Sequence, residues 1–430
     1  MPELNLPEWT FSTLRDNAQL ITDGAHASPP TRSWGRPIAT VQNMGSQSID
    51  VGSCRLISGE DFEKLVKGNC APEIDDVLFS KDGTVGKTFV YRQSDRVVLL
   101  SSIAIIRLKK DKLNPEFCSQ FLLSPFFYQE LENLKSGSAI RRIVLGELEK
   151  LRIPTPPLPE QRKIAAVLSC VDDVIEKTRA QIDKLKDLKT GMMQELLTEG
   201  IGHTEFKDSP VGRIPSEWDV LTVSELLAHR QYPMRSGPFG SSLLKAELVS
   251  KGVPLLGIDN VHVEEFKSDF KRFVTSEKSR ELARFLVKPG DVMVTIMGTV
   301  GRCCVVPNGI GRALSSKHVW TISLDTDQYL PELLCWQVNH APWVLRQFRN
   351  DAQGGVMASI SSSTLRNLKV PVPPREEQEK IARFYSGVIS RINSASQKLE
   401  KLQFLKKALM ADLLAGKVRV NVDQKESEVA

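Results

Sequence analysis

The chain of 430 residues lacks the long apolar runs, leader patterns and paired cysteines that mark several classes of protein. No run of about 18 apolar residues occurs, so no transmembrane helix is expected. The first residues, MPELNLPEWTF, have no basic stretch followed by an apolar core, so no secretory signal is expected. The seven cysteines show no CxxC spacing, which favours a reduced, cytoplasmic protein over a disulfide scaffold or a zinc site.

Catalytic motifs are missing as well. The segment DGTVGKT at Asp82 ends like a phosphate-binding loop, but that loop needs a glycine where Lys81 stands. The six histidines have no metal-binding spacing, and neither a Gly-x-Ser-x-Gly elbow nor the Asn/Asp-Pro-Pro-aromatic motif of adenine methyltransferases occurs. We therefore expect no enzyme activity, cofactor or metal in this chain, and we interpret the glycine-rich segment as a turn between strands.

What the sequence does contain is a long internal repeat. PPLPEQRKIAAVL begins at Pro156 and PPREEQEKIARFY begins at Pro373, and Gln161 and Gln378 are 378 − 161 = 217 residues apart. DDVLFSKDGTVGK has its counterpart in GDVMVTIMGTVGR, and LPEWTF has its counterpart in IPSEWDV. A nearly constant offset over so many positions predicts that about half of the chain is duplicated.

Each copy has the same predicted order of elements. Short apolar and β-branched runs broken by Gly, Asn, Asp and Ser predict strands and turns, with one amphipathic helix at 115–134 or 331–350. A proline-rich hinge follows, and then a long helix whose apolar residues repeat every 3.5 positions, as in a coiled coil. From 160 to 197 such a helix spans ~57 Å at about 1.5 Å per residue. Either the two helices pair with each other, or each packs on its own domain.

The globular halves contain candidate nucleic-acid contacts in their loops. Arg and Asn can bind base edges in a bidentate manner, whereas Lys favours phosphate. The alternative is that these side chains are solvated turn residues. The candidates are Asn43, Lys81, Thr84, Lys87, Arg141, Arg142, Arg235, Asn260, Thr299, Arg302, Lys317 and His318. The frame repeats while exposed polar residues differ between the copies, which is typical of two recognition modules with different targets. The net charge of +5 permits DNA binding without demanding it.

Taken together, the motifs RIPTPPLPEQRKIAAVL, KVPVPPREEQEKIARFY and DGTVGK resemble those of the specificity (S) subunit of Type I restriction-modification systems. The resemblance implies an α+β protein with two duplicated mixed α/β target recognition domains, separated by two long helices that form an antiparallel coiled coil. It places target recognition domains at 1–155 and 201–372, a central helical spacer at 156–200, a C-terminal helical spacer at 373–416 and a flexible tail at 417–430.

The same resemblance implies the partners. We expect the chain to recognise a bipartite, asymmetric site in double-stranded DNA and to bind two modification (M) and two restriction (R) subunits, with no membrane partner. S-adenosylmethionine, ATP and Mg are expected only in those subunits. The repeated helix starts are expected to bind the M subunits through Glu160, Gln161, Glu377 and Gln378. The rival hypotheses are a duplicated scaffold that binds no DNA and a stand-alone enzyme.

Overall fold

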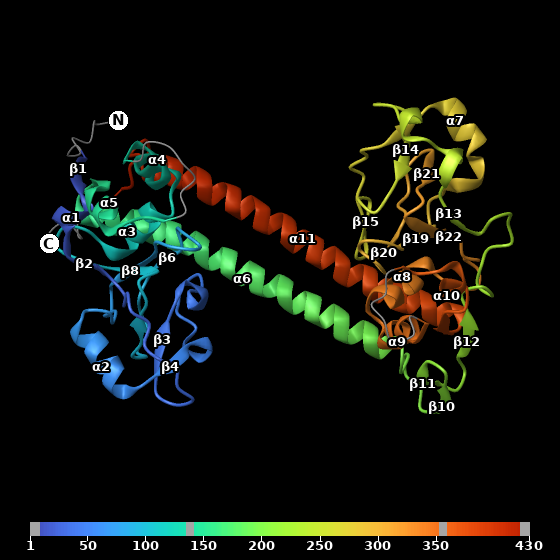
Figure 1. The fold of residues 1–430 in the computed structure, drawn as a ribbon, viewed down its shortest axis with the longest axis horizontal. Helices are drawn as coiled ribbons and strands as arrows, with labels where there is room; N and C mark the ends of the chain where they lie inside the picture. Colours follow the sequence, from blue (N-terminus) through green and yellow to red (C-terminus); the bar gives the residue numbers. More distant parts are fainter. Residues whose placement is uncertain (1–8, 135–141, 352–358, 422–430) are drawn as a thin grey trace. The chain divides into compact units, whose positions relative to one another are not determined.

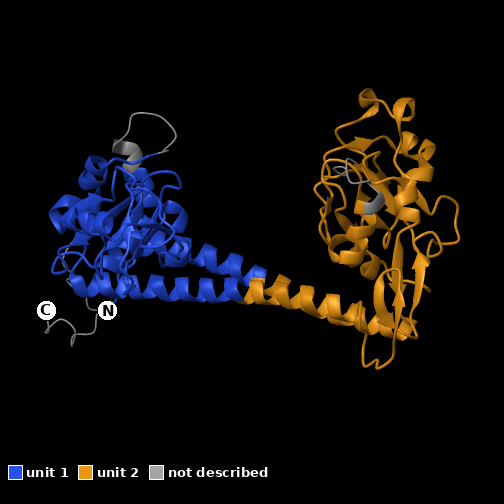
Figure 2. Ribbon diagram, turned by 60° about the horizontal axis from the view of Figure 1, so that its bottom comes forward, with its two compact units in different colours: residues 1–180, 396–430 blue, residues 181–395 orange. Residues whose placement is uncertain are grey.

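A computed structural model describes residues 9–134, 142–351 and 359–421. The chain divides into two compact units, which are described separately (Figure 2). Unit 1 comprises residues 1–180 and 396–430, and unit 2 comprises residues 181–395. Both divisions fall inside a long helix. In the described part of the chain, the helices are too short or too polar to span a membrane.

Unit 1 is built around an antiparallel sheet with the strand order β2-β8-β5-β6 and a second sheet with the order β4-β3-β7 (Figure 1). In the second sheet β3 is antiparallel to β4 and parallel to β7. Helix α3 packs on β5 and β6, and α2 packs on β3 and β7. The bounds are β2 Ala18–Asp23, β3 Arg36–Ala39, β4 Arg55–Ile57, β5 Val77–Ser80, β6 Thr88–Val90, β7 Val98–Leu99, β8 Ile103–Leu108, α1 Leu14–Asn17, α2 Gly59–Lys67, α3 Pro115–Leu122, α4 Pro125–Leu134 and α5 Leu145–Lys150.

Unit 2 repeats the order of these strands and adds one strand, β18, to the second sheet. Its antiparallel sheet has the order β13-β22-β19-β20, and its second sheet has the order β17-β14-β21-β18, with β14 parallel to β21. The bounds are β13 Met234–Ser236, β14 Val253–Leu256, β15 Val261–His262, β16 Glu265–Phe266, β17 Phe273–Val274, β18 Leu286–Val287, β19 Val292–Thr295, β20 Cys303–Val305, β21 Ala313–Ser315, β22 Val319–Ile322, α7 Ser276–Glu281, α8 Pro331–His340, α9 Pro342–Asp351 and α10 Ser362–Arg366. The matching strand orders agree with the predicted duplication.

The proline-rich hinges are strands rather than free linkers. In unit 1, β9 (Arg152–Thr155) pairs antiparallel with β1 (Thr10–Thr13), so that Pro154 lies opposite Phe11. In unit 2, β23 (Lys369–Val372) pairs in the same way with β12 (Asp219–Thr222). Each pair forms a separate two-stranded sheet, and proline is tolerated in edge strands such as these. A hairpin of β10 (Phe206–Ser209) and β11 (Gly212–Pro215) precedes β12.

The amphipathic helix predicted in each copy is two helices. In unit 1 the first helix ends at Leu122 and the second begins at Pro125, and in unit 2 the break falls between His340 and Pro342. Proline has no N–H for the helical hydrogen bond, and its ring clashes with the preceding turn. A proline can therefore begin the second helix but cannot continue the first, so the prediction of one continuous helix was wrong.

The two long helices, α6 (Leu158–Leu196) and α11 (Arg375–Leu413), have 39 residues each. This corresponds to ~58 Å at about 1.5 Å per residue. Gly200 and Gly416, with φ near +69° and +68°, follow the two helix ends in the left-handed conformation that favours glycine.

Each unit brings the beginning of one long helix together with the end of the other. In unit 1, Ile164 and Leu168 of α6 share a hydrophobic cluster with Met410 of α11. In unit 2, Leu197, just after α6, shares a cluster with Ile381 of α11. In unit 1, Glu160 also pairs with Arg419, and Asp172 pairs with Lys406. In unit 2, Lys189 contacts Tyr385, and Ile201 contacts Glu377. The helix segments within each unit therefore run in opposite directions.

Candidate nucleic-acid interface

Glu160 and Glu377, the acidic residues of the repeated helix start, are buried inside their units. The carboxylate of Glu160 accepts hydrogen bonds from Trp9 Nε1 at 3.1 Å and from Arg419 Nε at 2.6 Å. Glu377 has the same role in unit 2, and its donors are Trp218 Nε1 (2.8 Å), His203 Nε2 (3.0 Å) and the Ile201 backbone N–H (2.7 Å). Both tryptophans belong to the repeated LPEW and PSEW segments, so each contact joins two repeated motifs.

Gln161 and Gln378 are an identical pair of the repeat, and each is only 1% exposed. The side-chain amide of Gln161 forms hydrogen bonds between the first turn of α6 and the loop before α3. That of Gln378 does the same between α11 and the loop before α8. Gln161 accepts from the Asn114 N–H (2.8 Å) and donates to the carbonyls of Lys112 (3.0 Å) and Pro156 (2.7 Å). Gln378 accepts from the Leu330 N–H (3.0 Å) and donates to the carbonyls of Gln328 (2.8 Å) and Pro373 (2.9 Å).

These contacts correct the expected role of the four residues. The four residues are at most 8% exposed, and their polar side-chain atoms bind other parts of the same unit. A partner protein could not reach them in this structure. The repeat preserves them because a buried polar group needs a hydrogen-bond partner, and removing either partner is costly. The repeat of the LPEW and PSEW segments indicated that both tryptophans matter. It did not indicate that their side chains bind the glutamates of the helix starts.

In each unit the glycine-rich turn that was expected to bind DNA leaves the main sheet at one edge, which is formed by strand ends; Arg235 lies instead in β13, and its side chain binds Asp291 at the opposite end of β19. In unit 1, Ser80 pairs with Ile103 and Asp23 pairs with Ala104, so the ends of β2 and β5 lie at the start of β8. The turn from β5 to β6 leaves from this edge, as predicted for the glycine-rich segment. In unit 2 the equivalent turn joins β19 to β20.

Both turns are fixed by a hydroxyl at the end of the preceding strand. Ser80 Oγ donates to the carbonyl of Thr84 at 2.6 Å and accepts from the Lys87 N–H at 2.7 Å. Thr295 Oγ1 makes the matching bonds in unit 2, to the Thr299 carbonyl and from the Arg302 N–H. The turn backbones are thus held by repeated bonds, while their side chains differ.

Two of the predicted DNA-binding cations are buried. Lys81 is 2% exposed, and its Nζ lies 2.9 Å from Asp23 Oδ2. Arg235 is 4% exposed and pairs with Asp291. Burial lowers the pKa of Arg235 against the opposing effect of the Asp291 carboxylate. These two ion pairs lie inside the protein, so neither cation can act as a surface contact in this structure. Each acidic partner is more than 50 residues away in the sequence, which is why the sequence did not indicate the pairing.

Asn43 and Asn260 hold turns rather than extending from them. Asn43 Oδ1 accepts from the Thr40 N–H at 2.9 Å, and Asn260 Oδ1 accepts from the Gly257 N–H at 3.0 Å. The amide nitrogen of Asn43 donates to the Ser53 carbonyl, and that of Asn260 donates to the Lys267 carbonyl. Their constant offset of 217 is explained by this shared structural task.

The remaining candidates stay at or near the surface. Thr84, Arg142 and Lys317 are exposed, and Lys87, Thr299, Arg302 and His318 are partly exposed. Some have partners: Lys87 Nζ donates to the Met44 carbonyl at 2.7 Å, and Arg142 Nε lies 3.7 Å from Asp82 Oδ2. Arg141 lies outside the described residues.

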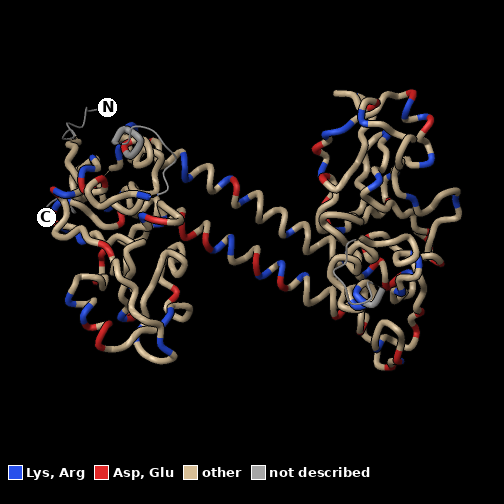
Figure 3. The backbone as a smooth tube through the Cα atoms, viewed as in Figure 1, with Lys and Arg blue, Asp and Glu red and all other residues tan. Residues whose placement is uncertain are grey.

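His318, one of the partly exposed candidates, lies near other positive charges. Burial and the nearby charges of Lys317 and Arg272 lower the pKa of His318. Basic and acidic positions are interspersed along both units (Figure 3).

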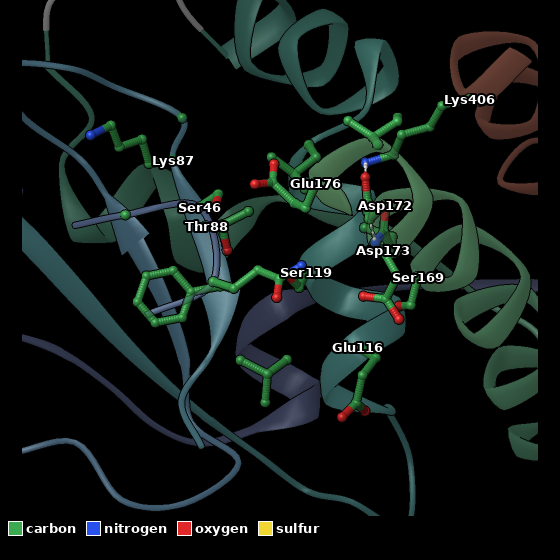
Figure 4. A pocket seen from close by; sticks show the side chains of 18 of the residues that line it. Ser46, Lys87, Thr88, Glu116, Ser119, Ser169, Asp172, Asp173, Glu176 and Lys406 are labelled. Carbon is green, nitrogen blue, oxygen red and sulfur yellow. Dashed lines mark hydrogen bonds and ion pairs between the residues drawn. The ribbon is translucent and has the colours of Figure 1, made fainter. Parts of the chain in front are cut away.

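Unit 1 also contains a cavity of about 1160 Å³ between the β5–β6 turn and the two long helices (Figure 4). Asp172 of α6 forms an ion pair at 2.6 Å with Lys406 of α11 on its wall, and the Gln120 amide donates to the same carboxylate at 2.8 Å. The described residues contain no group of His, Cys, Asp and Glu that could hold a metal ion. The contacts of Asp172 with Lys406 and Gln120 join α3, α6 and α11 and are therefore structural.

Comparison with known proteins gives a consistent result. The family described as "Type I restriction modification DNA specificity domain" matches residues 14–187 and 261–403. The chain is 26% identical over 368 residues to the type I restriction enzyme MjaVIII specificity subunit of Methanocaldococcus jannaschii, which covers 84% of this chain and 83% of that protein. It is 21% identical over 378 residues to the EcoBI specificity subunit of Escherichia coli, which covers 79% and 74% of the two chains.

A solved structure shares the fold. The S subunit of a type I restriction-modification system from M. genitalium aligns with a TM-score of 0.57 at 15% identity, over 96% of this chain and 97% of that chain. The family match covers well over half of the sequence. The chain therefore belongs to the type I restriction-modification DNA specificity family, and it is a non-catalytic subunit that provides DNA sequence specificity.

Proposed function

We propose that the chain recognises a bipartite, asymmetric DNA site, with unit 1 reading one half-site and unit 2 reading the other. The observation that carries this proposal is the repeated frame with different exposed residues. The main sheets of both units have the same strand order and the same turn held by a strand-end hydroxyl, yet Lys87 in one turn corresponds to Arg302 in the other. Two different sets of side chains on equivalent loops would meet two different base sequences, which makes the complete site asymmetric.

In this proposal the surface candidates at the sheet edges contact DNA, and the buried ones hold the loops in position. Among the described residues the direct candidates are Thr84, Lys87, Arg142, Thr299, Arg302, Lys317 and His318; Arg141, which lies outside the described residues, stays a candidate from the sequence alone. Lys81, Arg235, Asn43 and Asn260 act indirectly, through the contacts described above.

The partner subunits supply the chemistry. We propose two M subunits, which bind S-adenosylmethionine and methylate adenine, and two R subunits, which use ATP and Mg for translocation and cleavage. Because the repeated helix starts are internally bonded, the M subunits would contact other surfaces of the repeat. The two long helices would pair as an antiparallel coiled coil and fix the gap between half-sites. The antiparallel packing within each unit supports this arrangement.

Methylation mapping of a host genome tests the proposal. Cells that express the chain with its M subunits should contain a gapped, adenine-methylated motif that is absent without the chain. Exchange of residues 1–150 for the equivalent region of a relative should alter one half of the motif and leave the other half and the gap unchanged. If both halves change, the modular assignment is wrong. If the assembled complex shows no DNA binding that weakens steeply with salt, as phosphate contacts require, the scaffold that binds no DNA is favoured instead.

A further inference from the structure

The segment before β3 contains the only strongly exposed tryptophan among the six of the chain. Trp34 is 76% exposed, whereas Trp218, Trp336 and Trp343 are at most 4% exposed, and Trp9 and Trp320 are partly buried. One exposed apolar side chain is common on protein surfaces and needs no function by itself. An exposed indole becomes informative when its neighbours also indicate a ligand.

Trp34 is flanked in the sequence by two arginines whose guanidinium groups have no partner within the described part of the chain. Arg32 and Arg36 are both exposed, and within the described parts of the chain neither side chain makes an ion pair or a hydrogen bond. Other arginines of unit 1 differ in this respect: Arg92 pairs with Asp75, and Arg107 pairs with Asp76. Arg32 and Arg36 therefore retain all five donors each for a ligand.

The backbone beneath these side chains is held firmly. Arg55 Nη1 donates to the Pro29 carbonyl at 2.8 Å, and the Arg32 N–H donates to the Leu56 carbonyl at 2.8 Å. Gly35 has φ near +143°, and a Cβ atom there would lie 2.0 Å from the Ile57 carbonyl oxygen. Only glycine fits such a close approach. The loop is thus preorganised, which lowers the entropy cost of binding by its side chains.

Unit 2 repeats the loop but not its side chains. SWGRP at 33–37 corresponds to SKGVP at 250–254, again with an offset of 217. Gly252 has φ near +153° and approaches the Val274 carbonyl as Gly35 approaches that of Ile57. The bridge between Arg32 and Leu56 has its counterpart between Val249 and Phe273. Within this common frame, Arg32, Trp34 and Arg36 are replaced by Val249, Lys251 and Val253.

We propose that Arg32, Trp34 and Arg36 form a DNA-contacting element that serves only the half-site read by unit 1. Arg32 and Arg36 contact phosphates on either side, and the Trp34 ring packs against a deoxyribose or between two base pairs of the groove. The inference rests on the proposed function. DNA is favoured over a protein partner because two exposed guanidinium groups four residues apart, without an ion pair in the described part of the chain, suit a regular anionic ligand, and duplex DNA provides one charge per ~1.7 Å of axis.

Duplex binding by the assembled S–M complex tests this element. The duplex contains the motif found by methylation mapping, and a scrambled duplex serves as the reference. Trp34→Ala should weaken specific binding about 5- to 100-fold, as expected when one aromatic side chain no longer stacks on a base. The double variant Arg32→Ala/Arg36→Ala should reduce the slope of log K against log salt by about 1.8, that is, about 0.9 for each phosphate that is no longer neutralised.

Matched controls come from the same unit. Phe11 is 60% exposed and Arg15 is exposed and paired with Glu149 at 2.9 Å, so Phe11→Ala and Arg15→Ala remove an exposed ring and an exposed charge elsewhere. Both controls should bind the duplex as the unchanged complex does. Acrylamide quenching adds a direct readout: the part of the emission that Trp34→Phe removes should be quenched freely without DNA and protected by the specific duplex.

The outcomes separate the two proposals. If the variants bind DNA normally with an unchanged salt slope while the gapped motif still depends on the chain, this element is withdrawn and the proposed function stands. If the variants lose M subunits in gel filtration instead of losing DNA, the element is a protein interface and the inference is wrong. If no chain-dependent motif exists, both the proposed function and this inference fail.

Discussion

Replacing Gln378 by leucine tests whether the repeated helix start is an internal fastening or a docking surface. Leucine is similar in size but cannot replace the three hydrogen bonds of the amide. The bond to the Pro373 carbonyl is buried, whereas those to Leu330 and Gln328 are partly buried, so water can compensate for the last two in part. A buried polar group left without a partner costs about 1–3 kcal/mol. The expected loss of stability in unit 2 is therefore about 2–4 kcal/mol.

Urea unfolding followed by tryptophan emission measures this loss. Four of the six tryptophans lie in unit 2, so the emission mainly reports on that unit. With a slope of about 2 kcal/mol/M, the midpoint should fall by about 1–2 M. Gln397 is an exposed glutamine of the same helix, and Gln397→Leu should change stability by no more than about 0.5 kcal/mol.

The equivalent replacement Gln161→Leu should destabilise unit 1 in the same way, since its three bonds match those of Gln378. The reasoning is refuted if Gln378→Leu unfolds at the same urea concentration as Gln397→Leu and yet fails to bind M subunits. That result would mean that the amide is exposed to a partner in solution, and the original expectation of a docking residue would be restored.

Three further predictions concern the helices and their contacts. Lys406→Met should destabilise unit 1 by about 1–2 kcal/mol in thermal or urea unfolding, because Asp172 is left partly buried without its cation; an unchanged midpoint would mean that solvent screens the pair. Burial raises the pKa of Glu264, but the bonds and charges of His340 and Lys189 outweigh it and hold the pKa below its ordinary 4.5. The stability that this carboxylate contributes should be present above about pH 4.5 and lost as the pH falls below it, and Glu264→Gln should remove that part of the pH dependence from the unfolding midpoint. Insertion of one heptad at facing levels of both long helices adds ~10.5 Å, or about three base pairs, to the gap of the methylated motif; a preserved gap would exclude the helices as the ruler.

The sequence was most informative where the duplication imposes a pattern. The offset of 217 and the 3.5-residue period predicted two long helices, each preceded by an extended proline-rich segment, and both are present. Pro125 indicated a helix break, but the prediction gave more weight to the amphipathic pattern on both sides of it and therefore assumed one helix. The role of Gln161 was not predictable in the same way, because a repeat reveals that a position matters without revealing which way its side chain points. The pairing of Lys81 with Asp23 depends on the neighbouring ends of two strands and has no local sequence signal.

The internal repeat also explains which polar residues stay constant. Asp76 and Asp291 occupy the same turn in the two units, and each carboxylate accepts the backbone N–H three residues earlier, at 2.7 Å from Glu73 and 2.8 Å from Lys288. Each also binds an arginine, but that arginine comes from β8 in unit 1 and from β13 in unit 2.

The acid is thus retained because the local turn requires it, while the balancing charge can come from whichever neighbouring strand provides it. The same reasoning applies to the loop before β3. The close approach to a backbone carbonyl requires a glycine at positions 35 and 252. By contrast, no contact within the described structure requires the side chains of Arg32 and Trp34. In a duplicated recognition protein, a residue that the fold requires is the same in both copies. An exposed residue that differs between the copies can instead be determined by the ligand that each copy binds. Such departures on a rigid loop are therefore the first places at which to look for DNA contacts.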